Sequence, residues 1–184
     1  MFPEYKDNFD RIRPAGMILG YPVIDLKSTA RHLDIGIEGY PDYDKINFGQ
    51  VHPNVDPADI FVRENNKTYV NFEIAMNAYM FGGYPTDEQI YQYSLQNHVT
   101  DTTPPAFIWH GGEDGLIYPR NSFMFAEALR EHNIPCELHV FGKGGHGLGL
   151  ANEVTENNPW EVNEQCAMWP KLAADWIKSI LRQQ

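Results

Sequence analysis

Two glycine-rich loops contain the side chains with the clearest capacity for chemistry. Residues 110–115 read His-Gly-Gly-Glu-Asp-Gly and include Asp114, and residues 144–147 read Gly-Gly-His-Gly and include His146. A carboxylate can accept a hydrogen bond from one imidazole nitrogen and fix the tautomer, while the other nitrogen takes a proton from a nucleophile. The loops therefore predict an acid–histidine pair made of Asp114 and His146.

Each of these residues also has a plainer interpretation. An aspartate beside glycine is often only a turn residue. A histidine in a glycine loop is often only a surface side chain. The spacing leaves these interpretations open. What separates them is whether the elements around the two loops bring Asp114 and His146 together.

The elements that must position the loops alternate between strand and helix. Apolar runs and helical spacing predict four of them in order, over residues 106–110, 121–132, 136–141 and 169–181. Asn121 or Ser122 is expected to cap the first helix. Such alternation predicts a parallel sheet with right-handed crossovers. Adjacent parallel strands place both loops at the same end of the sheet, where sites form in folds of this class.

The first half of the chain is less regular. Residues 15–24 are apolar and predict a strand buried on both faces, whereas residues 26–70 show no clean period and predict loops and short elements. Residues 69–81 are expected to form a helix that ends at Gly82-Gly83. A second, short helix is expected from the capping box Thr86-Asp87-Glu88-Gln89 to about Tyr93.

Composition limits the class of protein. The chain has 184 residues, about one domain by length, and a net charge of −11. Nucleic-acid binding needs a basic surface, so no nucleic-acid partner is expected. No apolar run is long enough to span a membrane, and the first 14 residues lack the apolar core of a signal peptide. The two cysteines form no C-x-x-C pair. A cytoplasmic protein without a membrane partner is expected.

Several segments together resemble the α/β-hydrolase-fold esterases and lipases, most closely their acetyl-xylan-esterase-like branch. His110 with Asp114 and Asn121-Ser122 resembles the acid loop of that family, and residues 143–149 resemble its catalytic-histidine loop. Residues 18–24 resemble the strand after the nucleophile helix. The similarity covers residues 14–25 and 81–182, although Ile117-Tyr118-Pro119 stands where the family normally has Val-Pro.

The resemblance implies a partial α/β-hydrolase fold, a parallel sheet with flanking helices, formed by a single partial domain over residues 1–184. Residues 27–80 would be an insertion, either a cap over the substrate or a surface decoration. Asp114 would be the triad acid and His146 the general base. The substrate would be a small-molecule ester, with a short acyl group or an acetylated sugar, and no metal or organic cofactor would be needed.

The family's nucleophilic serine lies in G-x-S-x-G, and none of the four serines fits that pattern; nor does either cysteine. Ser122 lies near Asp114 but is expected to cap a helix. Since removing such a serine costs about 10⁶ in kcat, we expect the chain alone to be nearly inactive, as the C-terminal part of a serine esterase. The alternative is a truncated, non-catalytic binding or oligomerisation module of the same fold.

The first strand would leave an apolar edge open, and open edges invite pairing. A missing N-terminal portion, a second copy in a homo-oligomer, or residues 1–14 are expected to cover it.

Overall fold

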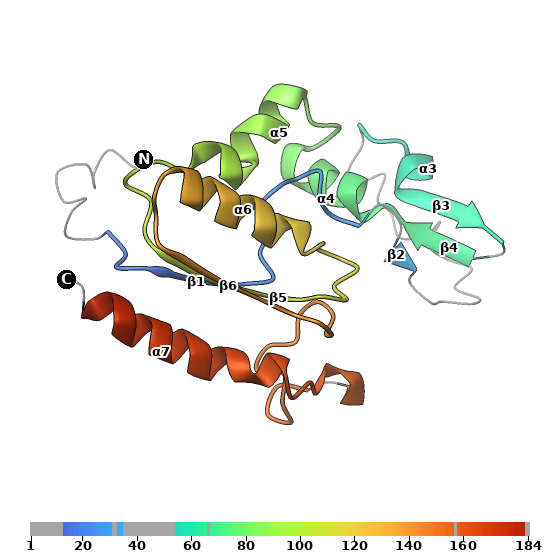
Figure 1. The fold of residues 1–184 in the computed structure, drawn as a ribbon. Coiled ribbons are helices and arrows are strands. Elements are labelled where there is room, and N and C mark those ends of the chain that lie inside the picture. Colours follow the sequence, from blue (N-terminus) through green and yellow to red (C-terminus); the bar gives the residue numbers. More distant parts are fainter. Residues whose placement is uncertain (1–12, 31–32, 35–53, 66, 157, 183–184) are drawn as a thin grey trace.

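A three-stranded parallel sheet forms the centre of the computed structural model, which describes residues 13–30, 33–34, 54–65, 67–156 and 158–182 (Figure 1). Its strands are β1 (Met17–Gly20), β5 (Ala106–Gly111) and β6 (Cys136–Phe141), in the order β1-β5-β6. The parallel register pairs Met17 with Ala106 and Ala106 with Cys136. The strands predicted over residues 106–110 and 136–141 are confirmed, as is their parallel pairing.

Helices cover both faces of this sheet. Helix α6 (Arg120–Glu131) crosses from β5 to β6 over one face, and α7 (Trp169–Leu181) lies along the other (Figure 1). Helix α5 (Asp87–Tyr93) begins with the predicted capping box, in which Thr86 and Gln89 bond each other's backbone N–H groups. Three short 3-10 helices lie at Leu95–His98, Pro159–Glu161 and Cys166–Met168.

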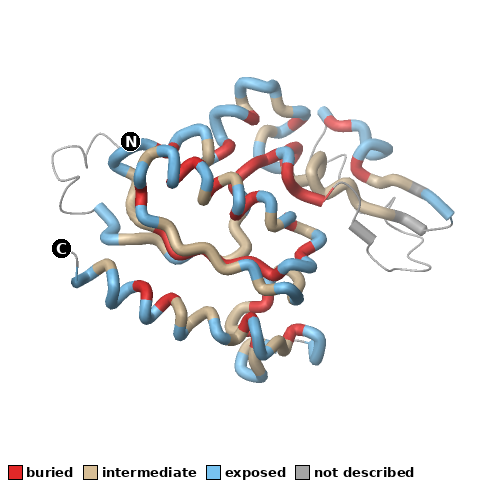
Figure 2. The backbone as a smooth tube through the Cα atoms, in the orientation of Figure 1, coloured by how far each residue is buried: buried red, intermediate tan, exposed pale blue. Residues whose placement is uncertain are grey.

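The core has one layer on each face of the sheet because successive side chains of β5 point in opposite directions. Ile108 packs with Phe125 and Leu129 on the α6 side. Phe107 and Trp109 pack with Trp176 on the α7 side, which explains the apolar face predicted for residues 169–181. All six residues of β5 are buried, and Figure 2 shows this strand in red through the middle of the molecule.

The first strand differs from its prediction. Strand β1 ends at Gly20, four residues before the apolar run does, because Tyr21 adopts a positive φ of 37° and turns the chain out of the ladder. Within the described residues β1 pairs only with β5, so its other edge is open. Ile18 is 43% exposed, and the prediction of a strand buried on both faces is therefore wrong.

The start of α6 also differs from its prediction. The residue before the helix is Pro119, and Asn121 and Ser122 lie within the first turn instead of capping it. The Asn121 carbonyl accepts hydrogen bonds from the backbone N–H groups of Ile24 and Asp25, at 2.9 and 2.8 Å. The Ser122 hydroxyl forms a hydrogen bond with the buried side chain of His110. Both side chains are therefore used in tertiary contacts, and neither caps the helix.

The described part of residues 26–70 has more regular structure than was expected. It forms an antiparallel sheet in the order β2-β4-β3, beside the main sheet (Figure 1). The elements are β2 (Leu33–Asp34), α3 (Pro57–Ile60), β3 (Phe61–Glu64) and β4 (Lys67–Val70). The rest of the predicted insertion over 27–80, namely residues 31–32, 35–53 and 66, lies outside the described residues, as do residues 1–12.

Helix α4 (Phe72–Phe81) contributes Ala78 to a small core with Val55 and with Ile60 of α3, and Phe61 and Val70 of the small sheet pack against that core. The helix begins where the Asn71 side chain accepts the N–H of Ile74 and ends at Gly82, whose φ is 69°, so the predicted glycine stop is confirmed. The helix starts three residues later than predicted, because Tyr69 and Val70 belong to β4. Asn77 of α4 donates to the carbonyl of Leu26 and ties the small sheet to the main one. No helix in the described ranges is long and apolar enough to cross a membrane.

Candidate active site

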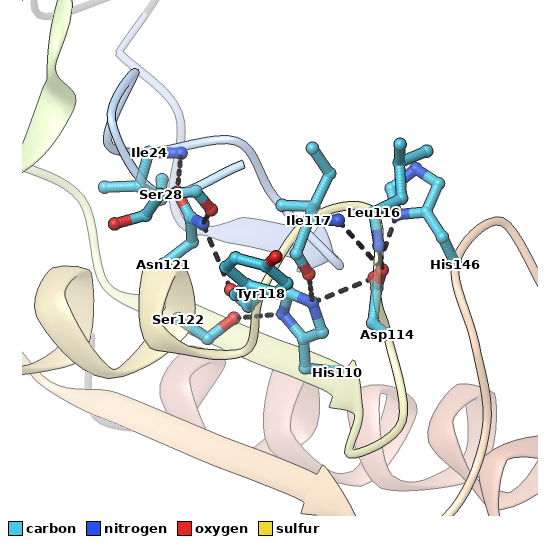
Figure 3. A network of polar contacts seen from close by, with 10 residues as sticks. All are labelled: Ile24, Ser28, His110, Asp114, Leu116, Ile117, Tyr118, Asn121, Ser122 and His146. Atoms are coloured by element: carbon cyan, nitrogen blue, oxygen red, sulfur yellow. Dashed lines mark hydrogen bonds and ion pairs between the residues drawn. The ribbon is translucent and has the colours of Figure 1, made fainter. Parts of the chain in front are cut away.

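Asp114 and His146 meet at the carboxyl end of the main sheet. Asp114 lies in the loop after β5 and His146 in the loop after β6. Nδ1 of His146 is 2.9 Å from Oδ2 of Asp114 (Figure 3). This distance corresponds to a charge-assisted hydrogen bond in which Nδ1–H donates to the carboxylate. Nε2 of His146 is then the nitrogen that can accept a proton.

The Asp114 carboxylate is fully buried but has four donors. Oδ1 accepts the backbone N–H groups of Leu116 and Ile117, at 3.0 and 2.9 Å, and Oδ2 accepts from His110 and His146. Burial by itself raises the pKa of Asp114, yet the hydrogen bonds from His110, His146 and Ile117 outweigh it and hold the pKa well below its ordinary value of 3.8. The carboxylate therefore remains ionised near neutral pH.

Backbone contacts hold the two loops against each other. Gly112 N–H donates to the carbonyl of Phe141 at 2.7 Å, and Glu113 N–H donates to that of Gly144 at 3.0 Å. A Cβ atom on Gly111 would lie 2.3 Å from the Gly144 carbonyl oxygen, so only glycine permits this approach. Gly144 itself has a φ of 106°, which other residues rarely adopt. The glycines are what allow the acid and the histidine to meet.

The His146 ring is partly open to solvent and packs against an aromatic side chain. Its side chain is 30% exposed. The ring of Tyr21, at the end of β1, lies edge-on to it with centroids 4.8 Å apart, and Tyr21 also contacts Trp109. In the described residues no hydrogen bond engages Nε2. The ring is thus oriented from one side and accessible from the other.

His110 is a member of the site that sequence reasoning did not assign. This histidine of β5 is completely buried, and its Nε2 lies 3.0 Å from Oδ2 of Asp114 and 2.8 Å from the carbonyl oxygen of Ile117 (Figure 3). Its Nδ1 lies 2.7 Å from the hydroxyl oxygen of Ser122. The available signal was the spacing of four between His110 and Asp114, which was noted only as part of a motif.

None of the four serines contacts His146. Ser122 is fully buried and bonds His110 instead. Ser28 and Ser94 both donate to the Asp25 carboxylate, and Ser179 donates to a backbone carbonyl of its own helix. Burial raises the pKa of both cysteine thiols to about 11, which disfavours the reactive thiolate. In the described part of the chain, Asp114 therefore bonds to His146, and no serine or cysteine side chain forms a hydrogen bond with that histidine.

A cavity lies near the pair, and the described residues form no metal-binding cluster. Among the residues that the structure describes, no group of three His, Cys, Asp or Glu side chains could hold a metal ion. A cavity of about 310 Å³ opens beside β1, between Tyr21, Trp109 and Trp169. Tyr21 lines this cavity and also packs on His146, so the cavity adjoins the candidate site.

Comparisons with known proteins show a family and a fold for this chain. The model of the prolyl oligopeptidase family matches residues 58–159, which is more than half of the chain. Endo-1,4-beta-xylanase B of Butyrivibrio fibrisolvens is 47% identical over 74 residues, which are 40% of this chain and 12% of that protein.

Solved structures match over nearly the whole chain. The carboxylesterase Cest-2923 of Lactobacillus plantarum is 28% identical with a TM-score of 0.58, over 96% of this chain and 50% of that one. An acetyl ester-xyloside bifunctional hydrolase of Caldicellulosiruptor lactoaceticus is also 28% identical with a TM-score of 0.55, over 91% and 43%. The predicted partial α/β-hydrolase fold is confirmed. The chain spans about half the length of these structures.

Proposed function

The chain belongs to the prolyl oligopeptidase family, and from that premise we propose that it provides the acid and the general base of a serine hydrolase that cleaves carboxylic esters. Asp114 is the acid and His146 the base. The observation that carries this proposal is the 2.9 Å contact between His146 Nδ1 and Asp114 Oδ2, with Nε2 of a partly exposed ring left to act on a substrate.

In the proposed reaction the two imidazole nitrogens of His146 have different roles, with Nδ1 bonded to Asp114 and Nε2 transferring the proton. Nε2 of His146 takes the proton of a serine hydroxyl as that oxygen attacks the ester carbonyl, and then gives the proton to the leaving alcohol. A water molecule, deprotonated in the same way, releases the acid from the acyl-enzyme. Asp114 stays ionised throughout and stabilises the imidazolium. Its four hydrogen-bond donors and lowered pKa suit that role.

We propose that the attacking serine lies in a G-x-S-x-G segment outside these 184 residues. The sequence contains no such motif, and each serine in it bonds to a partner other than His146. The chain by itself is then expected to show very little turnover, because loss of the serine costs about 10⁶ in kcat.

The proposed substrate is a small ester with a short acyl group, such as an acetylated sugar. Its support is the likeness at 28% identity to proteins named as a carboxylesterase and an acetyl ester-xyloside hydrolase. Residues 27–80 are proposed to be an insertion or a cap within the single domain 1–184. A cytoplasmic location is proposed from the two cysteines, which form no disulfide pattern.

A second candidate is a non-catalytic module that binds a partner or a second copy through β1. The open edge of β1 and the 43% exposure of Ile18 favour it. In that case His146 would have no substrate to act on.

One experiment separates the candidates. The DNA upstream of Met1 is translated in frame, and the polypeptide containing any G-x-S-x-G found there is assayed on 4-nitrophenyl acetate and on a peptide 4-nitroanilide. We expect the motif, together with acetate hydrolysis that His146→Ala abolishes. A stop codon close upstream, with a stable homo-oligomer of the chain, would support the module. Cleavage of the peptide alone would overturn the ester assignment.

A further inference from the structure

We propose that His110 is a positioning residue, which holds the Asp114 carboxylate in the orientation that His146 requires. The inference deepens the proposed function and rests on it for its catalytic consequence. It starts from a shared atom: Oδ2 of Asp114 is the acceptor for both histidines, at 3.0 Å from Nε2 of His110 and 2.9 Å from Nδ1 of His146 (Figure 3).

The protonation of His110 follows from its partners. Nε2 faces the Asp114 carboxylate and the Ile117 carbonyl oxygen, and neither group can donate a proton. Nε2 must therefore carry the hydrogen, which lies between two acceptors that would otherwise repel each other. A buried N–H at this point both attracts Oδ2 and keeps it at a fixed distance from Ile117.

A second contact fixes the other side of the His110 ring. In the neutral ring with hydrogen on Nε2, Nδ1 is an acceptor, and the Ser122 hydroxyl lies 2.7 Å away to donate to it. Ser122 belongs to the first turn of α6 and is fully buried, like His110. A continuous chain of hydrogen bonds thus runs from α6 through His110 and Asp114 to the loop of His146.

Among the described residues, no charged side chain other than Asp114 forms a hydrogen bond with His110 or His146. Asp114 is the titratable side chain that contacts both histidine rings, and Tyr21 packs on the ring of His146 and on Trp109. The Glu113 carboxylate accepts a hydrogen bond from the backbone N–H of Gly144, at 3.4 Å. In the described residues no lysine or arginine forms an ion pair with Asp114. His110 is therefore the side chain that can orient the carboxylate from the side opposite His146.

The test compares His110→Asn with His110→Gln. Both replacements are polar and uncharged, but the asparagine amide reaches only the place of Nδ1, beside Ser122, whereas the glutamine amide reaches that of Nε2, beside Asp114. The readout is the tautomer of His146, from its ¹⁵N chemical shifts in the 184-residue chain, with no substrate present. We expect the Nδ1–H tautomer in the unmodified chain and in His110→Gln.

In His110→Asn we expect the fraction of His146 protonated on Nε2 to rise about fivefold, the effect of one hydrogen bond of ordinary net strength. Equal tautomer populations in the two variants would overturn the proposal. The unmodified chain gives a further test that requires no variant to fold. Its His110 signals must show hydrogen on Nε2, and hydrogen on Nδ1 alone would overturn the proposal by itself.

Catalysis is measured separately, in the polypeptide that contains the nucleophile. His110→Asn should lower kcat on 4-nitrophenyl acetate about tenfold with KM unchanged, as losses of such supporting partners do at other sites, and His110→Gln should restore it. A tautomer shift without any ester hydrolysis would contradict the proposed function but support the positioning role of His110. Equal rates of ester hydrolysis in both variants would contradict the positioning role but support the proposed function.

Discussion

Nδ1 of His146 lies 2.9 Å from Oδ2 of Asp114, although 32 positions of sequence separate the two residues. The contact depends on the parallel ladder between β5 and β6, which ends with Gly111 paired to Phe141. From that point both loops leave the sheet side by side, and glycines let their backbones touch. The pair is therefore a product of the fold, and changes in the ladder, the glycines or the hydrogen bonds should affect it in distinguishable ways.

The stability of the protein should depend on the ionisation of Asp114. Because its pKa in the folded chain lies below the ordinary value of 3.8, the unfolded chain binds a proton first as the pH falls. The stabilisation is complete above about pH 5 and is lost progressively at lower pH, with a magnitude on the order of 2 kcal/mol. Urea unfolding across this range should show a flatter acid limb in Asp114→Asn than in the unmodified chain.

The matched control for that experiment is Asp175→Asn. Asp175 also has a lowered pKa, through hydrogen bonds from Lys171 and Lys178, but its side chain is 51% exposed. Solvent screens such surface pairs, so the acid limb should change little. An equal flattening in both variants would show that the buried network has no special role.

Gly111→Ala should destabilise the protein and disturb the histidine loop. The new methyl group would lie 2.3 Å from the Gly144 carbonyl oxygen, a backbone atom that cannot move without moving the loop. The expected cost is about 1–3 kcal/mol, typical of overpacking. Gly115→Ala is the control, since its Cβ would meet nothing within 4 Å. Equal melting temperatures for the two variants would contradict the close approach of the loops.

Ser122→Ala should lower stability without abolishing turnover in the nucleophile-containing polypeptide. Its hydroxyl is buried against Nδ1 of His110, so removing it leaves a buried acceptor unpaired, at a cost of about 1–3 kcal/mol. Loss of a true nucleophile would instead reduce kcat by about 10⁶. Rate measurements on 4-nitrophenyl acetate decide the matter, and complete inactivity of a folded Ser122→Ala variant would identify Ser122 as the nucleophile.

Leu129→Ala should be strongly destabilising, because Leu129 is fully buried between α6 and the sheet. Leucine-to-alanine changes in cores cost about 2–5 kcal/mol. Leu181→Ala makes the same chemical change in α7 at a side chain that is 56% exposed, and should stay within about 0.5 kcal/mol. Chemical denaturation measures the free energy of unfolding of both variants. A larger loss for Leu181→Ala than for Leu129→Ala would contradict the assignment of Leu129 to the core.

The elements nearest the site were the most predictable from sequence. The two strands were predictable because short apolar runs, bounded by proline and glycine, occupy residues 106–110 and 136–141. The last helix was predictable because apolar side chains recur at helical spacing over residues 169–181. In each case the local pattern agrees with the structure. The positions of the loops followed from the parallel pairing of two such strands. The sequence therefore predicts that Asp114 and His146 lie together.

Features that depend on distant contacts were not predictable. Asn121 has the residue type of a helix cap, but its partners Ile24 and Asp25 lie nearly a hundred positions away. His110 was correctly predicted to lie in a strand. No local sequence pattern indicated that its ring would be fully buried and bonded to Asp114. The sheet of β2, β3 and β4 is short and antiparallel, and its strands lack the alternation that identifies longer ones.

The central claim is that Asp114 and His146 act as one catalytic unit, and a double-mutant cycle tests it most directly. The rate to measure is kcat on 4-nitrophenyl acetate for the nucleophile-containing polypeptide, with Asp114→Asn, with His146→Ala and with both changes. We predict losses of about 10⁴ or more for each single change and no further loss in the double variant, as residues acting together behave. Losses that multiply, or full activity without His146, would contradict the account.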